Sequence, residues 1–486
     1  MMRHQLRAKL HVSWFMAAWS LGVVLGVVLV ANVSYGFFAS WGWLLAGLVI
    51  LSPLFFVRKC HHWMLMAAVL SGVIVGLWRG SIGQSGLDNY QQLYGKEVMV
   101  KGVVLEDPDI DKRSNTLLRL GDLRINEQRI NGIMWVSMVH SDVIKRSDIV
   151  TVRGKLSEGF GAFAARISRA RLHRVERPVP GDVAVGVRDW FAERVRMHMP
   201  DTESSLGLGF LLGLRRALPA DLSEDLKVAG LTHIIVASGY NLTILVQLAR
   251  RLFCKKSKYL SMLSASLMII GFMALTGLSP SMSRAGLVAG MSLAAWYYGR
   301  TIHPLVLLPV AAAITLLINP QFGWNDLGWQ LSFVAFAGVI ILAPLLQRYF
   351  FGKKEPGMLR QIFGETLSAQ IMTTPLLIGA FGVVSTVALA ANMLILPFVP
   401  LAMLLTFLVG LFAPVPIIGE ALAIPTTWLL GYMVQVARAL AGQEWSQLEL
   451  SLQVWQIIFL YAILGFIIWW LQRQTKLRLR QVSLIE

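Results

Sequence analysis

The chain has 486 residues, of which 56% are hydrophobic and 15% charged, and its formal net charge is +17 at pH 7. So large an apolar fraction excludes an ordinary soluble globular protein, because the surface of such a protein needs more polar residues. The positive charge does not by itself indicate a nucleic-acid-binding protein. Nineteen of the 44 Lys and Arg residues fall in six short segments that flank apolar runs, which is typical of the cytoplasmic side of a membrane protein.

Three apolar runs in the first 80 residues, at 12–33, 37–57 and 63–78, are long enough or nearly so to cross a bilayer as helices. The first run follows basic residues, as a signal peptide does, but no A-x-A-like cleavage site follows it. We therefore interpret it as an anchor. Three crossings from the cytoplasm predict that residues 81–180 lie outside the cytoplasmic membrane. Cys60 and Cys254 lie in basic stretches and are interpreted as free cytoplasmic thiols.

Residues 81–180 differ from the rest of the chain, because short alternating segments separated by turn signals replace the long apolar runs. The predicted strands are 97–105, 116–125, 130–139, 148–156 and 165–175. Five short strands in about 80 residues suggest a small barrel or a sandwich, and a barrel of the OB type is the natural candidate. The last strand carries Arg166, Arg169, Arg171 and Arg174. This pattern fits either a groove for an anionic polymer or a solvated strand near anionic lipid headgroups, and composition does not decide between them.

Residues 181–230 are predicted to form amphipathic helices that lie at the outer interface or cap the core, because they are too polar to span. Apolar runs return after residue 230. The further candidate spans are 231–253, 260–276, 284–298, 304–318, 329–346, 362–380, 383–412, 421–440 and 455–471. The run 383–412 contains Pro397 and Pro400 and is expected to cross once as a broken helix. Both termini then lie in the cytoplasm.

The predicted fold is thus a polytopic α-helical membrane protein with an inserted extracytoplasmic OB-like barrel. Its predicted domains are three transmembrane helices (1–80), the barrel (81–180), interfacial helices (181–230), a multi-helix membrane domain (231–472) and a basic cytoplasmic tail (473–486).

Polar or ionisable residues interrupt several of the later spans. Such residues are costly at membrane depth and often line a path. The candidate channel-lining residues are His233, Ser238, Gly239, Asn241, Ser283, Arg284, Asp326, Gln330, Ser332, Gln370 and Asn392. Any one of them could instead pair two helices, and Arg284 with Asp326 could form a structural ion pair. The number of interruptions in one half of the chain favours a path.

No pattern of catalysis is evident in the sequence. The chain contains no H-E-x-x-H, no paired-cysteine metal pattern, no Walker-type glycine loop and no G-x-S-x-G element. His233 and Ser238 are five residues apart and would share a helix face poorly. We therefore predict no catalytic residue, no metal and no cofactor.

Five ordered segments resemble the ComEC family, the channel proteins of bacterial natural transformation. They are 210–219 (the family's "LLLGDR" element), 230–239 ("GLSHLLAISG"), 279–285 ("SPSVLRA"), 319–333 ("NP…DVGFQLSF") and 368–397 ("SAQ…P" and "NLL.LP"). The chain departs from the family pattern in three ways. Leu214 stands at the aspartate of the first element, and Asn241 stands at a usual histidine. The family's common C-terminal metallo-β-lactamase-like domain has no counterpart, because no histidine follows His303.

The resemblance implies that residues 205–440 form a conduit that passes single-stranded DNA into the cytoplasm, with the barrel guiding DNA at the outer mouth. Phosphate contacts would come from the four barrel arginines, Arg215 and Arg216, with Arg284 in the conduit. The implied partners are single-stranded DNA, the lipid bilayer, a DNA receptor, a separate nuclease and a cytoplasmic motor ATPase or strand-binding protein. The alternatives are a small-molecule or lipid transporter on the same conduit fold, and an intramembrane enzyme using His233 or Asp326.

Overall fold

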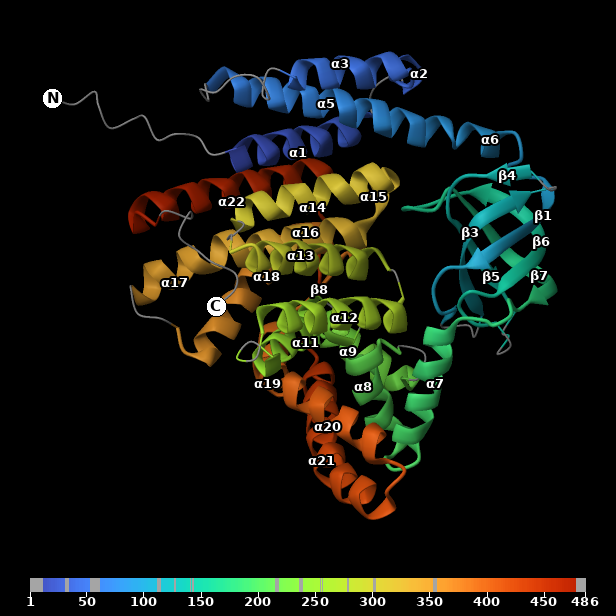
Figure 1. Ribbon diagram of the computed structural model, residues 1–486, viewed down its shortest axis with the longest axis vertical. Coiled ribbons are helices and arrows are strands. Elements are labelled where there is room, and N and C mark those ends of the chain that lie inside the picture. Colours follow the sequence, from blue (N-terminus) through green and yellow to red (C-terminus); the bar gives the residue numbers. More distant parts are fainter. Residues whose placement is uncertain are drawn as a thin grey trace. The chain divides into compact units, whose positions relative to one another are not determined.

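A computed structural model of the protein (Figure 1) describes residues 12–30, 35–52, 62–111, 115–125, 128–139, 141, 144–214, 218–235, 239–253, 255, 257–277, 279–299, 303–352 and 356–477. The contacts divide the chain into two compact units. Unit 1 comprises Met1–Gly181 and Ile302–Gln330, and unit 2 comprises Asp182–Thr301 and Leu331–Glu486. The sequence did not suggest that residues 302–330 belong with the N-terminal helices. Cys60 and Cys254 lie outside the described residues.

Seven helical stretches in the described part of the chain are long and apolar enough to cross a membrane. They are Val12–Leu29, Trp63–Ser85, Lys258–Thr276, Leu327–Phe351, Ala388–Phe412, Pro416–Ala441 and Val454–Thr475. Trp41–Leu51 and Pro304–Ile318 are shorter apolar helices. The chain is therefore a multi-pass membrane protein, as its composition predicted.

The helices of unit 1 pack through glycines. Helix α1 (Val12–Leu29) lies beside α5 (His62–Ser85), and α3 (Trp41–Leu51) and α14 (Pro304–Ile318) flank this pair. A Cβ atom on Gly22 of α1 would lie 3.0 Å from the Cα atom of Gly72 of α5, and a Cβ atom on Gly76 of α5 would lie 3.0 Å from the Cα atom of Gly26 of α1. These two G-x-x-x-G pairs let the backbones approach closely, which is how helices associate without a hydrophobic driving force in lipid.

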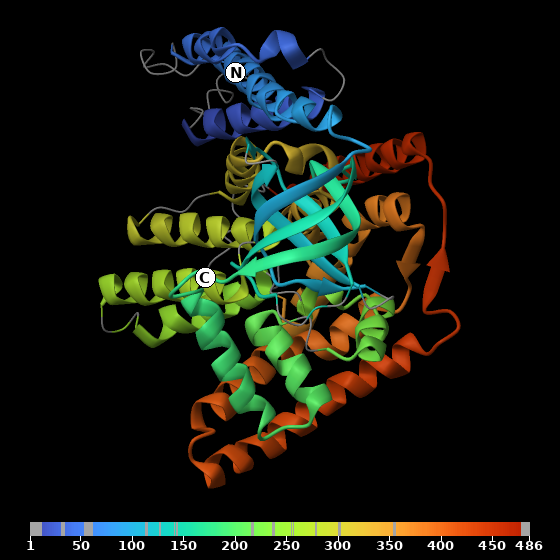
Figure 2. The same ribbon diagram turned by 90° about the vertical axis from the view of Figure 1, so that its right-hand side faces the viewer.

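The inserted domain is a closed barrel (Figure 2). Its strands are β1 (Glu97–Val104), β3 (Thr116–Ile125), β5 (Met134–Met138), β6 (Ile149–Glu158) and β7 (Ala165–Glu176). β1 pairs with both β3 and β6, which closes the barrel, and β5 runs parallel to β7. This arrangement is that of an OB-type barrel, so the predicted fold and strands are confirmed. The structure adds the short strands β2 (Asp109–Ile110) and β4 (Gln128–Ile130).

Unit 2 begins with α7 (Val183–Arg196), α8 (Asp201–Leu212) and α9 (Ala220–Val228). The prediction of an amphipathic interfacial helix is wrong for α8, because every residue from Ser204 to Leu212 is buried. Small residues allow this: a Cβ atom on Gly207 would lie 2.6 Å from the Thr406 hydroxyl oxygen of α20 (Val399–Phe412). Helix α8 therefore belongs to the core of unit 2 rather than to its surface.

The remaining elements of unit 2 surround that core. They are α10 (Thr232–Ile235), α11 (Gly239–Phe253), α12 (Lys258–Thr276), α13 (Pro280–Tyr297), the end of α16 (Leu327–Ala337), η3 (Gly338–Leu342), α17 (Ala343–Phe351), α18 (Met358–Phe381), β8 (Val383–Ser385), α19 (Ala388–Ile395), η4 (Leu396–Phe398), α20, α21 (Pro416–Ala441), β9 (Gln447–Glu449) and α22 (Val454–Thr475). The run 383–412 is broken as expected, because the 3-10 turn η4 containing Pro397 separates α19 from α20.

Candidate functional site

The segment between α9 and α11 is held by a glycine and an asparagine. Gly230 has a φ of +71°, which turns the chain sharply after α9. Asn241 is fully buried and donates from its amide to the carbonyl oxygens of Phe210 (2.9 Å) and Ile234 (3.3 Å). The exposed His233 places its Nδ1 3.0 Å from the carbonyl oxygen of Gly230. Asn241 is thus a joint between three segments, and Ser238 lies outside the described residues.

The start of α13 carries a buried cation. Arg284 is 8% exposed, its Nη2 lies 3.4 Å from the Ser281 hydroxyl oxygen, and its Cζ stands 5.3 Å from the Phe333 ring centroid of α16. Ser279 caps the helix through its hydroxyl oxygen, which accepts from the Met282 amide. Ser283 lies in the first turn, next to Arg284. The aromatic face compensates part of the cost of burying this charge.

The motif segments of unit 2 are linked by close approaches. A Cβ atom on Gly239 would lie 3.2 Å from the Ala285 Cβ, which joins α11 to α13 beside Arg284. A Cβ atom on Gly338 in η3 would lie 2.7 Å from the carbonyl oxygen of Ser368 in α18. A π-helical turn such as η3 is rare and often marks a functional site.

Further contacts lead from α18 back to Gly230, the glycine that follows α9. The Gln370 side chain of α18 donates to the carbonyl oxygen of Ser385 over 3.4 Å. A Cβ atom on Gly230 would lie 3.4 Å from the Ser385 Cβ and 2.6 Å from the Ala388 Cβ in α19, the helix that carries Asn392. The segments around 210, 230–234, 239–241, 284, 333–338, 368–370 and 385–392 therefore form one connected set, which we call the motif ring.

Several buried polar atoms on or beside the motif ring have no protein hydrogen-bond partner among the described residues. They are Asn241 Oδ1, Arg284 Nη1, Ser368 Oγ, Ser385 Oγ, Asn392 Oδ1 and Thr406 Oγ1. Buried polar groups are nearly always hydrogen-bonded in proteins, because leaving one unpaired costs free energy. Atoms of the same kind occur in unit 1, on Trp19, Trp78, Ser81, Gln84 and Gln321, so their presence alone does not distinguish unit 2.

Two candidate residues lie in unit 1 instead. Asp326 Oδ1 accepts from the Trp329 amide over 2.8 Å, so it caps α16. Gln330 donates to the carbonyl oxygens of Gly323 and Trp324, both at 3.4 Å. These contacts are local and structural. The contacts of Asp326 lie in unit 1 and those of Arg284 in unit 2, and no contact described for either residue is the ion pair considered from the sequence. Ser332, half-buried in α16, follows in unit 2.

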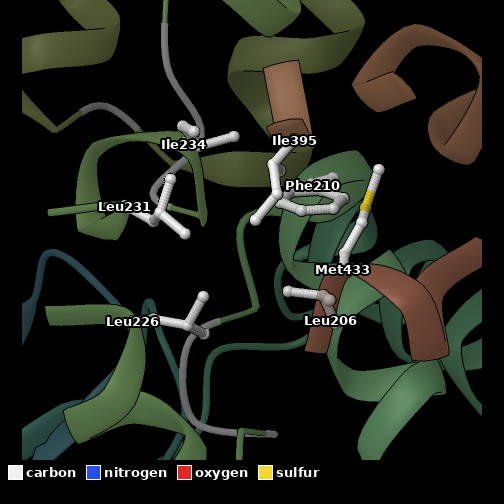
Figure 3. Close-up of a pocket in the computed structure, with 7 residues that line it drawn as sticks. All are labelled: Leu206, Phe210, Leu226, Leu231, Ile234, Ile395 and Met433. Atoms are coloured by element: carbon white, nitrogen blue, oxygen red, sulfur yellow. The ribbon is translucent and has the colours of Figure 1, made fainter. Parts of the chain in front are cut away.

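A cavity in unit 2 is lined by seven apolar side chains (Figure 3): Leu206, Phe210, Leu226, Leu231, Ile234, Ile395 and Met433. Its volume is about 10 Å³, no more than one water molecule needs. Because no polar group lines it, a water molecule there would lack partners. This cavity is a packing gap between α8, α9, α10, α19 and α21, and it is not a candidate path.

The basic side chains of strand β7 face outward, while Ala165, Ile167 and Ala170 of the same strand are buried in the barrel core. Arg166, Arg169, Arg171 and Arg174 are all exposed. Arg169 has a φ of +57° at a bulge, where the pairing of β6 with β7 shifts register. Arg171 stands opposite Arg153 of β6, and like charges at such positions destabilise a sheet. Arg153 also forms an exposed ion pair with Glu97, which offsets part of that repulsion. Arg215 and Arg216 lie outside the described residues.

Sequence reasoning overlooked the main-chain partners of the ring, such as the carbonyls of Phe210 and Ser385, because no residue type signals them. The G-x-x-x-G spacing of Gly22 with Gly26 could have been found from the sequence. Among the described residues, no three His, Cys, Asp or Glu side chains gather where they could hold a metal ion.

Fold and site together define a polytopic helical membrane protein that carries an inserted five-stranded barrel. The profile of the competence protein family matches residues 210–474, more than half of the chain, and includes the whole motif ring. The chain belongs to this family, as its resemblance to the ComEC family predicted.

ComE operon protein 3 of Bacillus subtilis (strain 168) is similar to this chain, with 26% identity over 206 residues. The matched part covers 41% of this chain and 25% of that protein, so the chain matches only a quarter of the length of this relative. No solved structure matches the chain.

Proposed function

We propose that the protein is a conduit in the bacterial cytoplasmic membrane that passes single-stranded DNA into the cytoplasm during natural transformation. Membership of the competence protein family supports a role in DNA uptake. In this proposal unit 2 provides the path, the barrel guides DNA at the outer mouth, and both chain termini lie in the cytoplasm. The channel-lining role of the ring residues is part of the proposal.

The motif ring carries this proposal. It brings Asn241, Arg284 and Asn392 into one connected set of helices, and each of them has a buried polar atom without a protein partner among the described residues. A path for a nucleic acid strand needs a polar interior with few fixed charges, so that the strand neither sticks nor is excluded. One buried cation among neutral amides and hydroxyls meets this requirement.

The barrel supports the proposal by its charge. Its exposed arginines Arg166, Arg169, Arg171 and Arg174 lie along β7, and Arg171 stands opposite Arg153 of β6. Contacts of this kind neutralise phosphates irrespective of base sequence. The protein itself would contribute no catalytic step, so strand degradation and the driving force would come from a separate nuclease, a DNA receptor, and a motor ATPase or strand-binding protein.

The test of the conduit is a deletion strain that takes up radiolabelled DNA. We expect surface-bound DNA at the wild-type level, no DNase-resistant DNA in the cytoplasm and no transformants. Complementation with Asn392→Leu, which removes a ring amide, should restore less DNase-resistant DNA than complementation with the wild-type gene. Normal transformation in the deletion strain would instead favour a small-molecule or lipid transporter.

The orientation has its own test. In a variant with Cys60 and Cys254 changed to Ser, Ser168→Cys on the barrel should react with a membrane-impermeant maleimide in whole cells. Gln474→Cys near the end of α22 should react only after the cells are broken. Both residues are exposed in the structure, so accessibility does not limit the reaction. The reverse pattern would place the barrel in the cytoplasm.

A further inference from the structure

Three aromatic side chains gather on the outside of the barrel. Trp135 of β5 and Phe160 in the β6–β7 turn have ring centroids 5.5 Å apart, at an interplanar angle of 71°. Phe160 and Phe163 are 5.2 Å apart at 58°. Trp135 faces outward because its neighbours Met134 and Val136 are buried in the barrel core. We call these three residues the aromatic cluster.

Two arginines flank the aromatic cluster. Trp135 pairs in register with Arg119 of the antiparallel neighbour β3 and with Arg166 of the parallel neighbour β7. The three side chains therefore form one row across three strands. The Arg119 Cζ lies 5.9 Å from the Phe163 ring centroid, and its Nη1 forms a 2.7 Å ion pair with Glu106.

Barrel packing alone does not account for the aromatic cluster. The barrel has its own continuous apolar core, which includes Leu118, Val136 and Ile167 but none of the three aromatic residues. Phe160 remains 46% exposed, and the Arg119 side chain 41%. Exposed aromatic rings beside cations are typical of surfaces that bind ligands with flat faces and negative charge.

We infer that the aromatic cluster with Arg119 and Arg166 is a stacking site for unpaired nucleobases, so that the barrel binds single-stranded DNA in preference to duplex. This inference rests on the proposed function and names the substrate form that the barrel selects. Bases stack on aromatic rings whatever their identity, whereas a duplex keeps its base faces covered by their neighbours. Arg166 lies at the edge of the row and belongs to β7. The other arginines of β7 then contact the sugar-phosphate backbone of the same DNA strand.

The aromatic and basic parts of this surface make different contributions to binding. Stacking on Trp135 and Phe160 adds affinity that depends little on salt, because it releases few counterions. Contacts of Arg166, Arg171 and Arg174 with phosphates add affinity that falls as salt rises, and they act on duplex as well. Single-strand preference should therefore depend on the rings, and salt dependence on the arginines.

The test uses the full-length protein in detergent micelles. Binding is measured by fluorescence anisotropy with a fluorescein-labelled oligothymidylate of about 20 nucleotides and with a duplex of the same length. Phe160→Ala, and separately Trp135→Ala, should weaken single-strand binding about tenfold while changing duplex binding less than about twofold. Trp135→Phe should retain most of the affinity. Arg171→Gln with Arg174→Gln should weaken both probes and reduce the salt slope by about two.

Trp190→Ala is the matched control. Trp190 on α7 is 52% exposed, and the Cζ atom of Arg194 lies 3.8 Å from the centroid of the Trp190 ring. This aromatic–arginine pair resembles the aromatic cluster in kind, but it lies outside the barrel. We expect no change in binding of either probe. Far-UV circular dichroism with a thermal scan checks that each variant folds, and Phe160→Ala, in an exposed turn, is the least disruptive substitution.

Two results would overturn the inference: equal loss of single-strand and duplex affinity in the aromatic variants, or no loss at all. These outcomes differ from failure of the proposed function. If deletion abolishes uptake while Phe160→Ala binds normally, the conduit stands and the stacking site does not. If the deletion strain transforms normally while the aromatic variants selectively lose single-strand binding, the stacking site stands without the conduit.

Discussion

The side-chain amide of Asn241 donates to the main-chain carbonyl oxygen of Phe210 over 2.9 Å and thereby joins the start of α11 to the end of α8. A second donation reaches Ile234 over 3.3 Å. Because Asn241 is fully buried, these two hydrogen bonds are shielded from bulk water. The residue that stands at a usual family histidine is thus a structural joint in this chain.

Asn241→Ala should destabilise unit 2, because it leaves two carbonyl oxygens without these donors and removes a buried side chain. Each buried polar group left unpaired costs about 1–3 kcal/mol. Thermal unfolding of the purified protein in detergent would show a lower midpoint. Thr243→Ala is the control, because the Thr243 hydroxyl donates only to the Gly239 carbonyl of its own helix. A midpoint unchanged by Asn241→Ala would contradict the assignment.

Gly338→Ala should disturb the packing of η3 on α18. The new Cβ atom would lie 2.7 Å from the Ser368 carbonyl oxygen and 3.0 Å from the Met372 Cγ, so main chain as well as side chain has to move. Overpacking of this kind costs about 1–3 kcal/mol. Gly290→Ala is the matched control, since a Cβ atom there meets nothing within 4 Å. The measurement is the amount of monodisperse protein after heating, and equal behaviour of the two variants would refute the prediction.

Arg79→Met should loosen the C-terminal end of α14. The Arg79 guanidinium donates from Nε to the Leu317 carbonyl oxygen (2.7 Å) and from Nη2 to that of Ile318 (2.8 Å). These carbonyls belong to the last turn of α14, where the carbonyl oxygens receive no hydrogen bond from the helix itself. Hydrogen exchange of the peptide that covers 311–323 should become faster. Arg129→Met, which removes an exposed ion pair with Asp122, should leave that peptide unchanged.

The barrel should lose stability in acid through Asp148. Burial alone would raise the pKa of this carboxyl, but hydrogen bonds from Arg177 and the Lys145 amide, with the charges of both residues, lower it below its ordinary value of 3.8. A carboxyl whose pKa is lower in the folded state than in the unfolded state stabilises the folded protein fully at pH values above its unfolded-state pKa. This contribution is lost as the pH falls through the folded-state pKa. The expected loss therefore lies below about pH 4.

Arg177→Gln should move this loss of stability to higher pH. The substitution removes the Arg177 charge and hydrogen bond that lower the pKa of Asp148, while burial still raises that pKa. The protein would be incubated at each pH and then pulse-labelled by hydrogen exchange at one fixed pH. Peptides of β6 and β7 report the barrel. Arg153→Gln, which breaks an exposed pair with Glu97, is the control and should not shift the profile. Identical acid profiles for Arg177→Gln and the unchanged protein would disprove the role of the pair.

Much of the fold could be predicted from local patterns. The five strands follow from period-2 alternation and turn residues, and the break at Pro397 follows from the missing amide of proline. The prediction was wrong for α8, whose small and polar residues resemble an interfacial helix although they pack in the core. Periodicity reports how apolar a face is, and it does not report which other helices cover the remaining faces.

The candidate site was predictable in part. The polar interruptions around Asn241, Arg284 and Asn392 are visible in the sequence, because such residues are rare in apolar runs. Their linkage through Gly239, Gly338 and Gly230 was not, since a glycine shows only that a close approach is possible and not what approaches. In the sequence, Asp326 and Gln330 looked equivalent to the other polar interruptions. In the structure, Asp326 caps α16 and Gln330 donates to the main chain of Gly323, so both make local contacts in unit 1.

Hydropathy and strand alternation are properties of neighbouring residues, so the sequence alone predicts a multi-pass membrane protein with one inserted barrel. The family resemblance also follows from local motifs. Which residues contact one another becomes known only from the three-dimensional packing. The motif ring joins segments that lie more than 100 residues apart in the chain, and the row of Arg119, Trp135 and Arg166 depends on the register of three strands. Contacts of that kind are set by packing and strand pairing between distant segments, which no local pattern encodes.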